Sequence, residues 1–209
     1  MKYFIDTEFI EGFHKPLFGK RRHFIDLISI GIVCEDGREY YAISKEYRFK
    51  DADKWVQDNV IIPMYTQEIS GFKRDYIKKE DFHKYIPNGK SNDDIRSKLF
   101  QFITCPKGDT VEFYGYYSDY DWVLLCSLFG RMIDLPKGFP MYCVDLKQMI
   151  DERANKIEVS TVIRGVNTFD EKLDFLKKHP EYPKQKDEHN ALADAKWNHE
   201  LFKFLKKIT

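Results

Sequence analysis

The sequence contains few cysteines, and their spacing predicts neither a metal site nor a disulfide framework. The four are Cys34, Cys105, Cys126 and Cys143, and no two of them form a C-x-x-C pair. Cys34 and Cys126 stand within apolar runs, as reduced thiols in a protein core commonly do. We therefore expect reduced core cysteines in a cytoplasmic protein, rather than a zinc site or a secreted, disulfide-linked fold.

Long apolar runs, low-complexity tracts and internal repeats are also absent. No stretch of about 18 apolar residues could cross a membrane, and no Ser/Gly-rich tract separates two halves of the chain. The N-terminus goes directly into a predicted strand that carries a candidate ligand, so no cleavable signal is expected. The 209 residues, 43% of them hydrophobic, suffice for the core of one domain. We expect a single domain over residues 1–209 with no membrane partner.

The chain has no net charge that would draw a long nucleic acid onto its surface. Thirty-four basic residues balance 34 acidic ones, which argues against an extended nonspecific groove but is compatible with a short grip on a strand end. One basic turn stands out, and it contains Lys15, Lys20, Arg21, Arg22 and His23. Contact with phosphate groups, in particular by Arg21 and Arg22, and a solvated loop between strands both explain this turn.

Strand-like and helix-like patterns succeed one another and predict an α/β protein. We expect strands near residues 2–6, 24–34 and 38–44, with Asp36-Gly37 as a hairpin turn, and a further strand from about residue 110. Helices are expected near residues 51–60, 91–105, 118–129, 145–152, 168–178 and 190–208. Ser91 and Ser118 are the predicted N-caps of two of them, and Gly130 is a predicted stop. This pattern indicates a mixed sheet flanked by helices.

The last predicted helix carries a carboxylate on its apolar side. At roughly 100° per residue, four residues lie within about 40° of Asp194, namely Asn198, Leu201, Leu205 and Ile208. Most charged residues of the helix fall on the other side. An isolated buried carboxylate costs several kcal/mol in lost hydration unless a cation or hydrogen-bond donors compensate. We therefore expect a compensating group next to Asp194.

A pair of carboxylates follows the first predicted strand. Asp6 and Glu8 come directly after apolar residues 3–5, and side chains two apart in a strand project from the same face, roughly 7 Å apart. Hard divalent cations such as Mg²⁺ or Mn²⁺ prefer oxygen ligands, so the pair suits a metal site. A strand that runs out into a solvated turn is the alternative for a D-x-E sequence taken alone.

A further carboxylate stands in the first turn of the helix predicted near residues 118–129. Asp121 lies on the leucine-rich side of that helix, whereas Asp119 points about 160° away, toward solvent. Asp121 is therefore the inward carboxylate. Taken alone, a carboxylate in the first turn of a helix is more often one that interacts with the helix dipole than a catalytic one.

Together these motifs resemble the DEDDh exonuclease superfamily of the ribonuclease H-like fold. The order is Asp-x-Glu after the first strand, Tyr-x-Asp entering a middle helix, and His-x4-Asp opening the last helix. The resemblance implies that four acidic residues form a metal centre, namely Asp6, Glu8, Asp121 and Asp194, and that His189 completes the set. It also implies a ribonuclease H-like α/β fold.

Further segments resemble a small group within that superfamily. They are Tyr40 to Ser44, Trp55-Val56, Gly138 to Tyr142 and Asp145 to Gln148. The group comprises bacterial and phage 3′-to-5′ exoribonucleases similar to the polyadenylate-specific exoribonuclease of mycobacteria. The resemblance implies a single-stranded RNA 3′ end as substrate and suggests a homodimer, although no apolar stripe in the sequence predicts a subunit interface.

The mechanism implied by the resemblance is two-metal hydrolysis at a free 3′ end. Two Mg²⁺ or Mn²⁺ ions roughly 4 Å apart stabilise the attacking and leaving oxygens in such centres. His189 and Asp194 cannot share a helix face, because residues five apart differ by about 140°, so His189 is expected in the loop or first turn before the helix. An imidazole with an unperturbed pKa near ~6.5 suits a general base. A plain surface histidine is the alternative.

Two questions stay open at the level of sequence. Phe9, beside Glu8, could stack on the terminal base of the substrate or belong to the core. The metal chemistry does not distinguish RNA from DNA, so a 3′-to-5′ DNA exonuclease of the proofreading or repair type is an alternative function. A noncatalytic nucleic-acid-binding module is a more distant one, and the full set of five candidate site residues argues against it.

Overall fold

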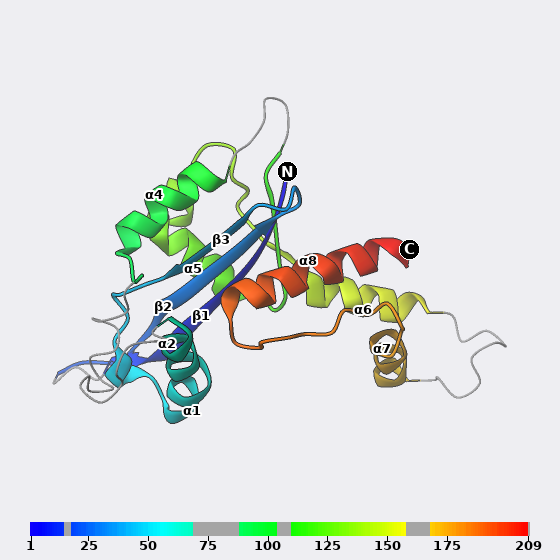
Figure 1. The fold of residues 1–209 in the computed structure, drawn as a ribbon, viewed down its shortest axis with the longest axis horizontal. Coiled ribbons are helices and arrows are strands. Elements are labelled where there is room, and N and C mark those ends of the chain that lie inside the picture. The colour runs from blue at the N-terminus through cyan, green and yellow to red at the C-terminus, as the bar shows by residue number, and fades with distance from the viewer. Residues whose placement is uncertain (15–17, 69–87, 104–109, 158–167, 209) are drawn as a thin grey trace.

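A mixed five-stranded sheet forms the centre of the structure (Figure 1). In the order β3-β2-β1-β4-β5, three strands are antiparallel, namely β1 (Lys2–His14), β2 (Arg22–Cys34) and β3 (Glu39–Ile43). β4 (Glu112–Gly115) and β5 (Val144–Asp145) continue the sheet in parallel with β1. The computed structural model describes residues 1–14, 18–68, 88–103, 110–157 and 168–208. The predicted mixed α/β sheet is confirmed, and it is consistent with a ribonuclease H-like fold.

The first two strands are longer than the sequence pattern predicts. β1 continues beyond the predicted residues 2–6 to His14, and β2 begins at Arg22. Strand pairing satisfies backbone N–H and C=O groups even where side chains are polar, and a hydrophobic pattern does not reveal such pairing. The predicted basic turn is therefore partly strand, because Arg22 and His23 belong to β2. Lys15 lies outside the described residues.

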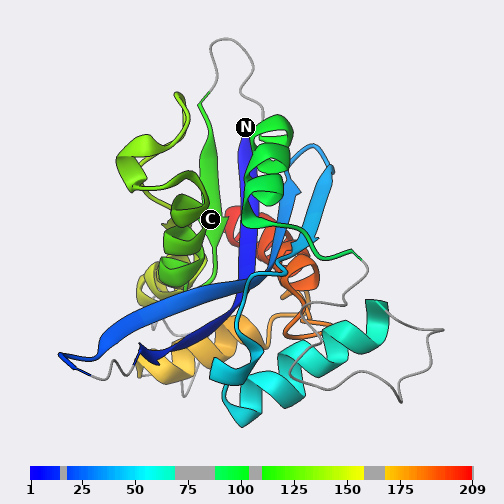
Figure 2. The same cartoon turned by 90° about the vertical axis from the view of Figure 1, so that its left-hand side faces the viewer.

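Helices cover both faces of the sheet (Figures 1 and 2). α4 (Asn92–Phe102) and α5 (Asp119–Phe129) pack with Tyr3 and Ile5 on one face, and α8 (Ala191–Lys207) packs with Phe4 on the other. Side chains alternate between the two faces along a strand. Asp6 and Glu8 therefore continue the row of Phe4 on the α8 side of β1.

A single glycine lets α8 approach β2 closely. A Cβ atom at Gly31 would lie 2.2 Å from the backbone oxygen of Ala191, the first residue of α8. No side chain fits that space. Because Gly31 pairs with Asp6 across the two strands, this close approach brings the start of α8 next to the D-x-E motif.

A helical segment after β3 packs under the outer part of β1 and β2. It consists of α1 (Lys54–Val56), a π-helical turn (Gln57–Ile61) and α2 (Ile62–Glu68). The helix predicted near residues 51–60 therefore begins later and runs further. Its start is set by Asp53, whose side chain accepts a hydrogen bond from the N–H of Val56 at 2.8 Å, as N-cap residues do.

The remaining predicted helices are present, with shifted ends. Ser91 caps α4 by accepting from the N–H of Asp94 at 3.2 Å, as predicted. α5 begins after Ser118, without a capping bond from its side chain, and stops at Gly130, whose φ is 115°. α6 (Leu146–Lys156) and α7 (Phe169–Lys177) complete the set expected there. Within the described ranges, no helix is long and apolar enough to cross a membrane.

The predicted core position of Cys34 and Cys126 is confirmed by the structure. Cys34 and Cys126 are buried and free, and Cys143 is free and partly buried. Cys105 lies outside the described residues. Cys34 and Cys126 contribute to the core between the sheet and the α4–α5 layer.

Candidate metal centre

Three carboxylates from the two ends of the chain meet where α8 begins. Asp6, Glu8 and Asp194 each offer an oxygen atom within 4.8 Å of the oxygens of the other two. Asp6 and Glu8 project from β1, and Asp194 belongs to the first turn of α8. Asp194 is buried, and the other two are partly buried. We call these three residues the carboxylate group, and they include three of the four predicted metal ligands.

Burial and mutual repulsion raise the pKa values within the carboxylate group. Burial, and then the charges of Asp194 and Asp121, raise the pKa of Glu8 to about 8. Burial and the charges of Asp121, Glu8 and Asp194 hold the pKa of Asp6 well above its ordinary value. Such repulsion is relieved by a nearby cation. Hard oxygen donors at this spacing fit Mg²⁺ or Mn²⁺, so the residues present suit a divalent metal site.

Asp121 lies next to the carboxylate group and accepts hydrogen bonds from Thr7, the middle residue of the D-x-E motif. Its Oδ1 accepts hydrogen bonds from the N–H of Thr7 at 2.8 Å and from the Thr7 hydroxyl at 2.5 Å. Burial raises the pKa of Asp121 to about 7, against these two hydrogen bonds, which lower it. Asp121 is buried and Asp119 is exposed, so the predicted orientation of this helix is confirmed.

The loop before α8 holds both oxygens of Asp194. The Nε2 of Gln185 donates to Oδ1 at 2.6 Å, and the backbone N–H of His189 donates to Oδ2 at 3.0 Å. Burial raises the pKa of Asp194, while these two hydrogen bonds lower it. Hydrogen-bond donors of the loop are thus one form of the compensation predicted for a buried carboxylate at this position.

His189 lies in the loop before α8, as the spacing argument predicts. It has a φ of 67° and precedes the N-cap Asn190. Its exposed imidazole contacts the indole of Trp55 edge to face, with ring centroids 4.9 Å apart. The charge of His189 lowers the pKa of Asp194. Trp55 of α1 therefore packs against one side of the His189 ring, next to the carboxylate group.

The three predicted substrate contacts do not gather at one place. Phe9 is partly buried, packs against the core and contacts the ring of Tyr120, with centroids 5.4 Å apart. Arg21 and Arg22 are exposed at the outer end of the β1–β2 hairpin. Of the three, only Phe9 adjoins the carboxylate group.

Comparison with known proteins identifies the family. The sequence profile of the 3'-5' exoribonuclease Rv2179c-like domain matches residues 1–206. The chain belongs to this exoribonuclease family. Two Mycobacterium tuberculosis proteins are similar to it, 3'-5' exoribonuclease Rv2179c of strain ATCC 25618 / H37Rv and 3'-5' exoribonuclease MT2234.1 of strain CDC 1551 / Oshkosh. Each is 36% identical over 153 residues, which cover 73% of this chain and 76% of the relative.

Membership in the exoribonuclease family confirms the enzyme class predicted from three short motifs. The chain is an enzyme of the exoribonuclease class. The family match covers the carboxylate group, Asp121 and His189.

Three residues that touch the centre of this exoribonuclease were not assigned from the sequence. Thr7 holds Asp121, Gln185 holds Asp194, and Trp55 contacts His189. Trp55 contributes to the family resemblance but carries no role there. Thr7 and Trp55 each contact a residue that is far away in the sequence. Gln185 lies in the loop before α8, outside any helix. The periodicity of a single helix or strand therefore predicts none of the three contacts.

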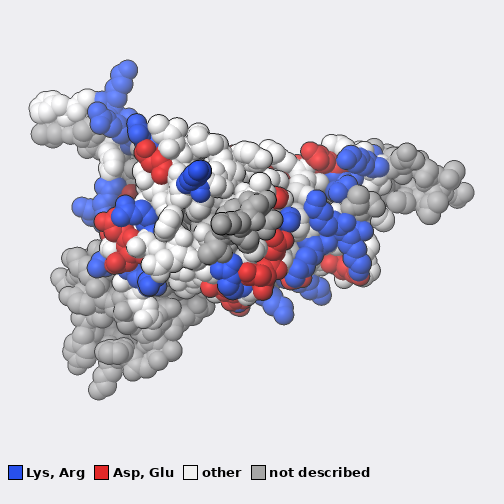
Figure 3. Space-filling model, turned by 90° about the horizontal axis from the view of Figure 1, so that it is seen from above, with Lys and Arg blue, Asp and Glu red and all other residues white. Residues whose placement is uncertain are grey.

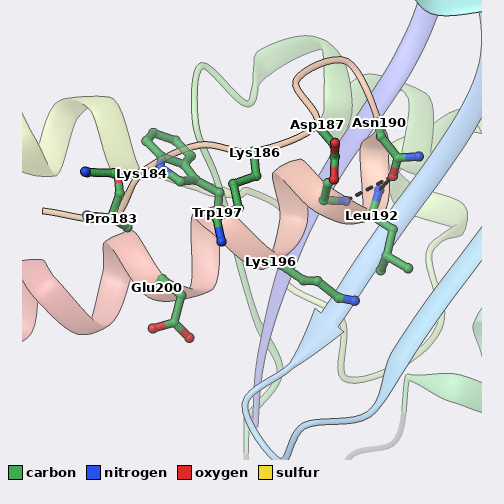
Figure 4. A pocket seen from close by; sticks show the side chains of 10 residues that line it. Pro183, Lys184, Lys186, Asp187, Asn190, Leu192, Lys196, Trp197 and Glu200 are labelled. Atoms are coloured by element: carbon green, nitrogen blue, oxygen red, sulfur yellow. Dashed lines mark hydrogen bonds between the residues drawn. The ribbon is translucent and has the colours of Figure 1, made fainter. Parts of the chain in front are cut away.

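A pocket of about 460 Å³ lies on the outer side of the same loop (Figure 4). It is lined by residues of the 183–190 loop and by α8, including Lys196 and Glu200. The indole N–H of Trp197 donates to the carbonyl of Pro183 at 3.0 Å, and Asn190 accepts from the N–H of Leu192 at 3.2 Å. These contacts fasten both ends of the loop. No member of the carboxylate group lines this pocket, so it is separate from the candidate metal centre.

Proposed function

We propose that this protein is a metal-dependent 3′-to-5′ exoribonuclease that releases nucleoside monophosphates from single-stranded RNA. The observation that carries the proposal is the carboxylate group, whose oxygens lie within 4.8 Å of one another. The chain belongs to a family of 3'-5' exoribonucleases, and such hydrolysis is commonly assisted by paired divalent cations. The carboxylate group is the proposed binding site for those cations.

The residues of the centre fit two Mg²⁺ or Mn²⁺ ions in a DEDDh arrangement. Asp6, Glu8 and Asp194 are the proposed ligands whose oxygens already lie together, and Asp121 is the fourth. When bound, such cations stabilise the charge that develops on the attacking and leaving oxygens. The hydrogen bonds from Thr7 fix one oxygen of Asp121, so this carboxylate is oriented before any cation arrives.

His189 is the proposed general base. Its imidazole takes the proton of the water that attacks the terminal phosphodiester. The backbone N–H of His189 is bonded to Asp194, so the position of the imidazole is tied to a proposed ligand. The contact with Trp55 restrains the ring from the other side.

Phe9, Arg21 and Arg22 are the proposed substrate contacts. Phe9 follows Glu8 directly and is partly exposed, so a terminal base can stack against it. Such stacking contributes about 1 to 3 kcal/mol. The two arginines, at the outer end of the hairpin, would meet phosphates further from the 3′ end.

We place this activity in one domain over residues 1–209, because the family match extends over residues 1–206. A cytoplasmic location fits the free thiols of Cys34, Cys126 and Cys143. The proposed homodimer rests on the family resemblance, and analytical ultracentrifugation of the purified protein tests it.

A time course with labelled strands tests the proposed reaction. RNA homopolymers labelled at the 3′ or the 5′ end, and DNA of the same lengths, are incubated with enzyme in EDTA and then with Mg²⁺ or Mn²⁺. We expect mononucleotides from the 3′ end of RNA, only when metal is present. Faster hydrolysis of DNA would identify a DNA exonuclease, because contacts to the 2′-OH distinguish the two. No hydrolysis with any metal would leave a noncatalytic binding module.

A further inference from the structure

Beyond the carboxylate group, β1 and β2 continue as a two-stranded arm. The pairing of β1 with β4 ends at Phe4, and the pairing of β2 with β3 reaches no further than Ser29. Residues 9–14 and 22–27 pair only with each other in the sheet. Figure 2 shows this arm as a long hairpin that projects to the left of the sheet. An arm of this kind offers two faces for contacts.

One face of the arm is fastened to the body by Arg48. Its guanidinium lies 4.5 Å from the centroid of the Phe24 ring and forms an ion pair with Asp26 at 3.0 Å. His14 stacks on the other strand's Phe24, with centroids 4.5 Å apart. Arg48, Asp26 and His14 are therefore engaged within the protein on this face, and the arm has a defined direction.

The other face carries a row of rings that begins beside Glu8. Successive centroids lie 5.4 Å apart from Phe9 to Tyr120, 6.3 Å from Tyr120 to His23, and 5.5 Å from His23 to Phe13. We call these four residues the aromatic row. Exposure increases outward, from the partly buried Phe9 to 38% for Tyr120 and 57% for Phe13.

Glu11 fixes the middle of the aromatic row. Its Oε1 accepts from the hydroxyl of Tyr120 at 3.1 Å and lies 2.8 Å from the Nε2 of His23. The carboxylate thereby orients two of the rings. Phe9 meets Tyr120 edge to face and Phe13 meets His23 edge to face. A preorganised row of partly exposed rings loses little conformational freedom when bases stack against it.

The outer end of the aromatic row is basic. Lys20 and Arg21 are exposed there, and within the described residues neither of them forms an ion pair. Arg22 is exposed as well, but it pairs with His14 and therefore projects from the opposite face of the arm. Figure 3 shows Lys and Arg side chains around the projecting arm at the upper left. In a chain with no net charge, these basic side chains give the tip of the arm a local positive charge.

We infer that the aromatic row and its basic end bind the nucleotides of single-stranded RNA that lie 5′ of the cleavage site. This inference rests on the proposed function and extends it to a second contact with the same substrate. Ring faces accept any base by stacking, and basic side chains accept the phosphates between bases. Combined aromatic and cationic groups distinguish this surface from an apolar subunit interface. The arm makes the enzyme favour long strands over dinucleotides.

Binding without hydrolysis tests the arm independently of catalysis. Anisotropy of a 5′-labelled 12-nucleotide single-stranded RNA is measured in EDTA over a range of salt concentrations. We expect Phe13→Ala to weaken binding about tenfold without changing the salt dependence. Affinity falls as salt rises, so the slope of log K against log salt is negative. In the double variant Lys20→Ala/Arg21→Ala its magnitude should decrease by about 1.4, at about 0.7 per lost phosphate contact.

Matched variants elsewhere serve as controls. Phe100→Ala removes a ring of similar exposure, 60%, from α4, and Lys98→Ala/Lys177→Ala removes the same charge from two other helices. Both controls should bind like the wild type. Equal binding by Phe13→Ala and wild type, or equal binding of double-stranded RNA, would overturn the inference. Loss of a dimer in Phe13→Ala, with RNA binding intact, would instead assign the aromatic row to a second copy of the chain.

Turnover separates failure of the arm from failure of the proposed function. The ratio of kcat/KM for the 12-nucleotide RNA to that for a dinucleotide should fall about tenfold in Phe13→Ala. If neither RNA is hydrolysed by the wild type, the proposed function fails, while the anisotropy result still decides whether the arm binds RNA. An unchanged ratio in an active enzyme contradicts the arm alone.

Discussion

At the scale of single residues, the proposed centre is a concentration of negative charge that the fold tolerates. Asp6 and Glu8 have pKa values raised by burial and by their acidic neighbours. Raised pKa values at a partly buried site commonly mark functional groups. The cost of this arrangement in the metal-free protein can be measured.

Removing one charge should stabilise the protein while abolishing its activity. We expect Asp6→Asn and Asp194→Asn to stop RNA hydrolysis and to leave Tm unchanged or higher, because clustered carboxylates repel one another. Hydrolysis of labelled RNA and thermal melting measure the two effects. Asp119→Asn is the control, since this exposed side chain lies near the buried Asp121 but points away. Near-normal turnover in Asp194→Asn would refute its assignment as a ligand.

Glu8 should make the metal-free protein less stable as pH rises. Its pKa is about 8 in the folded protein against an ordinary 4.5, so folding favours the protonated form. The stability from protonated Glu8 is complete below pH ~4.5 and is lost as pH rises through about 8. Between these values the wild type should lose on the order of 4 kcal/mol relative to Glu8→Gln in urea unfolding with EDTA, since each of the 3.5 pKa units between them corresponds to about 1.4 kcal/mol. Parallel pH profiles of the two proteins would contradict this expectation.

At the scale of elements, the loop before α8 joins the proposed ligand and the proposed base. Gln185 and the N–H of His189 both bond to Asp194, and His189 has a φ of 67°, in the left-handed region. α1 adds Trp55 on the outer side of the imidazole. The loop, α8 through Asp194 and α1 through Trp55 thus together determine the position of the His189 side chain.

His189 should be separable from metal binding. We expect His189→Ala to retain Mn²⁺ affinity, because carboxylates supply the ligands, and to lower the hydrolysis rate by about 10² to 10⁴. Trp55→Ala should lower the rate less, and Trp55→Phe should restore it, since a ring edge or face can still restrain the imidazole. Calorimetric titration with Mn²⁺ and initial rates measure the two effects. Loss of Mn²⁺ binding in His189→Ala would contradict its role as a base.

The close packing of α8 on the sheet depends on Gly31. We expect Gly31→Ala to destabilise the protein by about 3 kcal/mol or more, because its Cβ would overlap the backbone of Ala191. Mn²⁺ affinity should fall as well, since Asp194 would move away from Asp6. Gly37→Asn is the control, because nothing lies within 4 Å of a Cβ there and asparagine tolerates a positive φ. Urea unfolding and Mn²⁺ titration test both variants.

At the scale of the whole molecule, the centre joins the first strand to the last helix. Asp6 and Glu8 lie in β1, Asp194 in α8, and Asp121 in the middle of the chain. The arm then extends from the same strand that carries two of the proposed ligands. With this arrangement we expect the enzyme to hydrolyse the 3′ end of an RNA chain and not its interior.

Substrate ends should therefore decide whether hydrolysis occurs. We expect linear RNA with a free 3′ hydroxyl to be degraded, and the same RNA with a 3′ phosphate or in circular form to persist, because a site for a terminal nucleotide excludes an internal one. Gel analysis of the three substrates with Mg²⁺ or Mn²⁺ measures this. Cleavage of the circular RNA would show that the enzyme acts as an endonuclease.

The sequence predicted the features that depend on a few neighbouring residues. The inward orientation of Asp121 and Asp194, the loop position of His189, and the caps at Ser91 and Gly130 all follow from the helical period and from local turn chemistry. The ends of helices were less accurate, because the start of α1 depends on the cap at Asp53 rather than on apolar spacing.

The sequence by itself determined which side chains could form the centre, because one strand's period brings Asp6 and Glu8 to one face and one helix's period turns Asp194 inward. Only the tertiary structure decided what surrounds them. The contacts of Thr7 with Asp121 and of Trp55 with His189 join residues far apart in the chain. The length of the arm likewise depends on backbone pairing between two strands. Periodicity describes one element at a time, whereas these contacts exist only once separate elements have packed together.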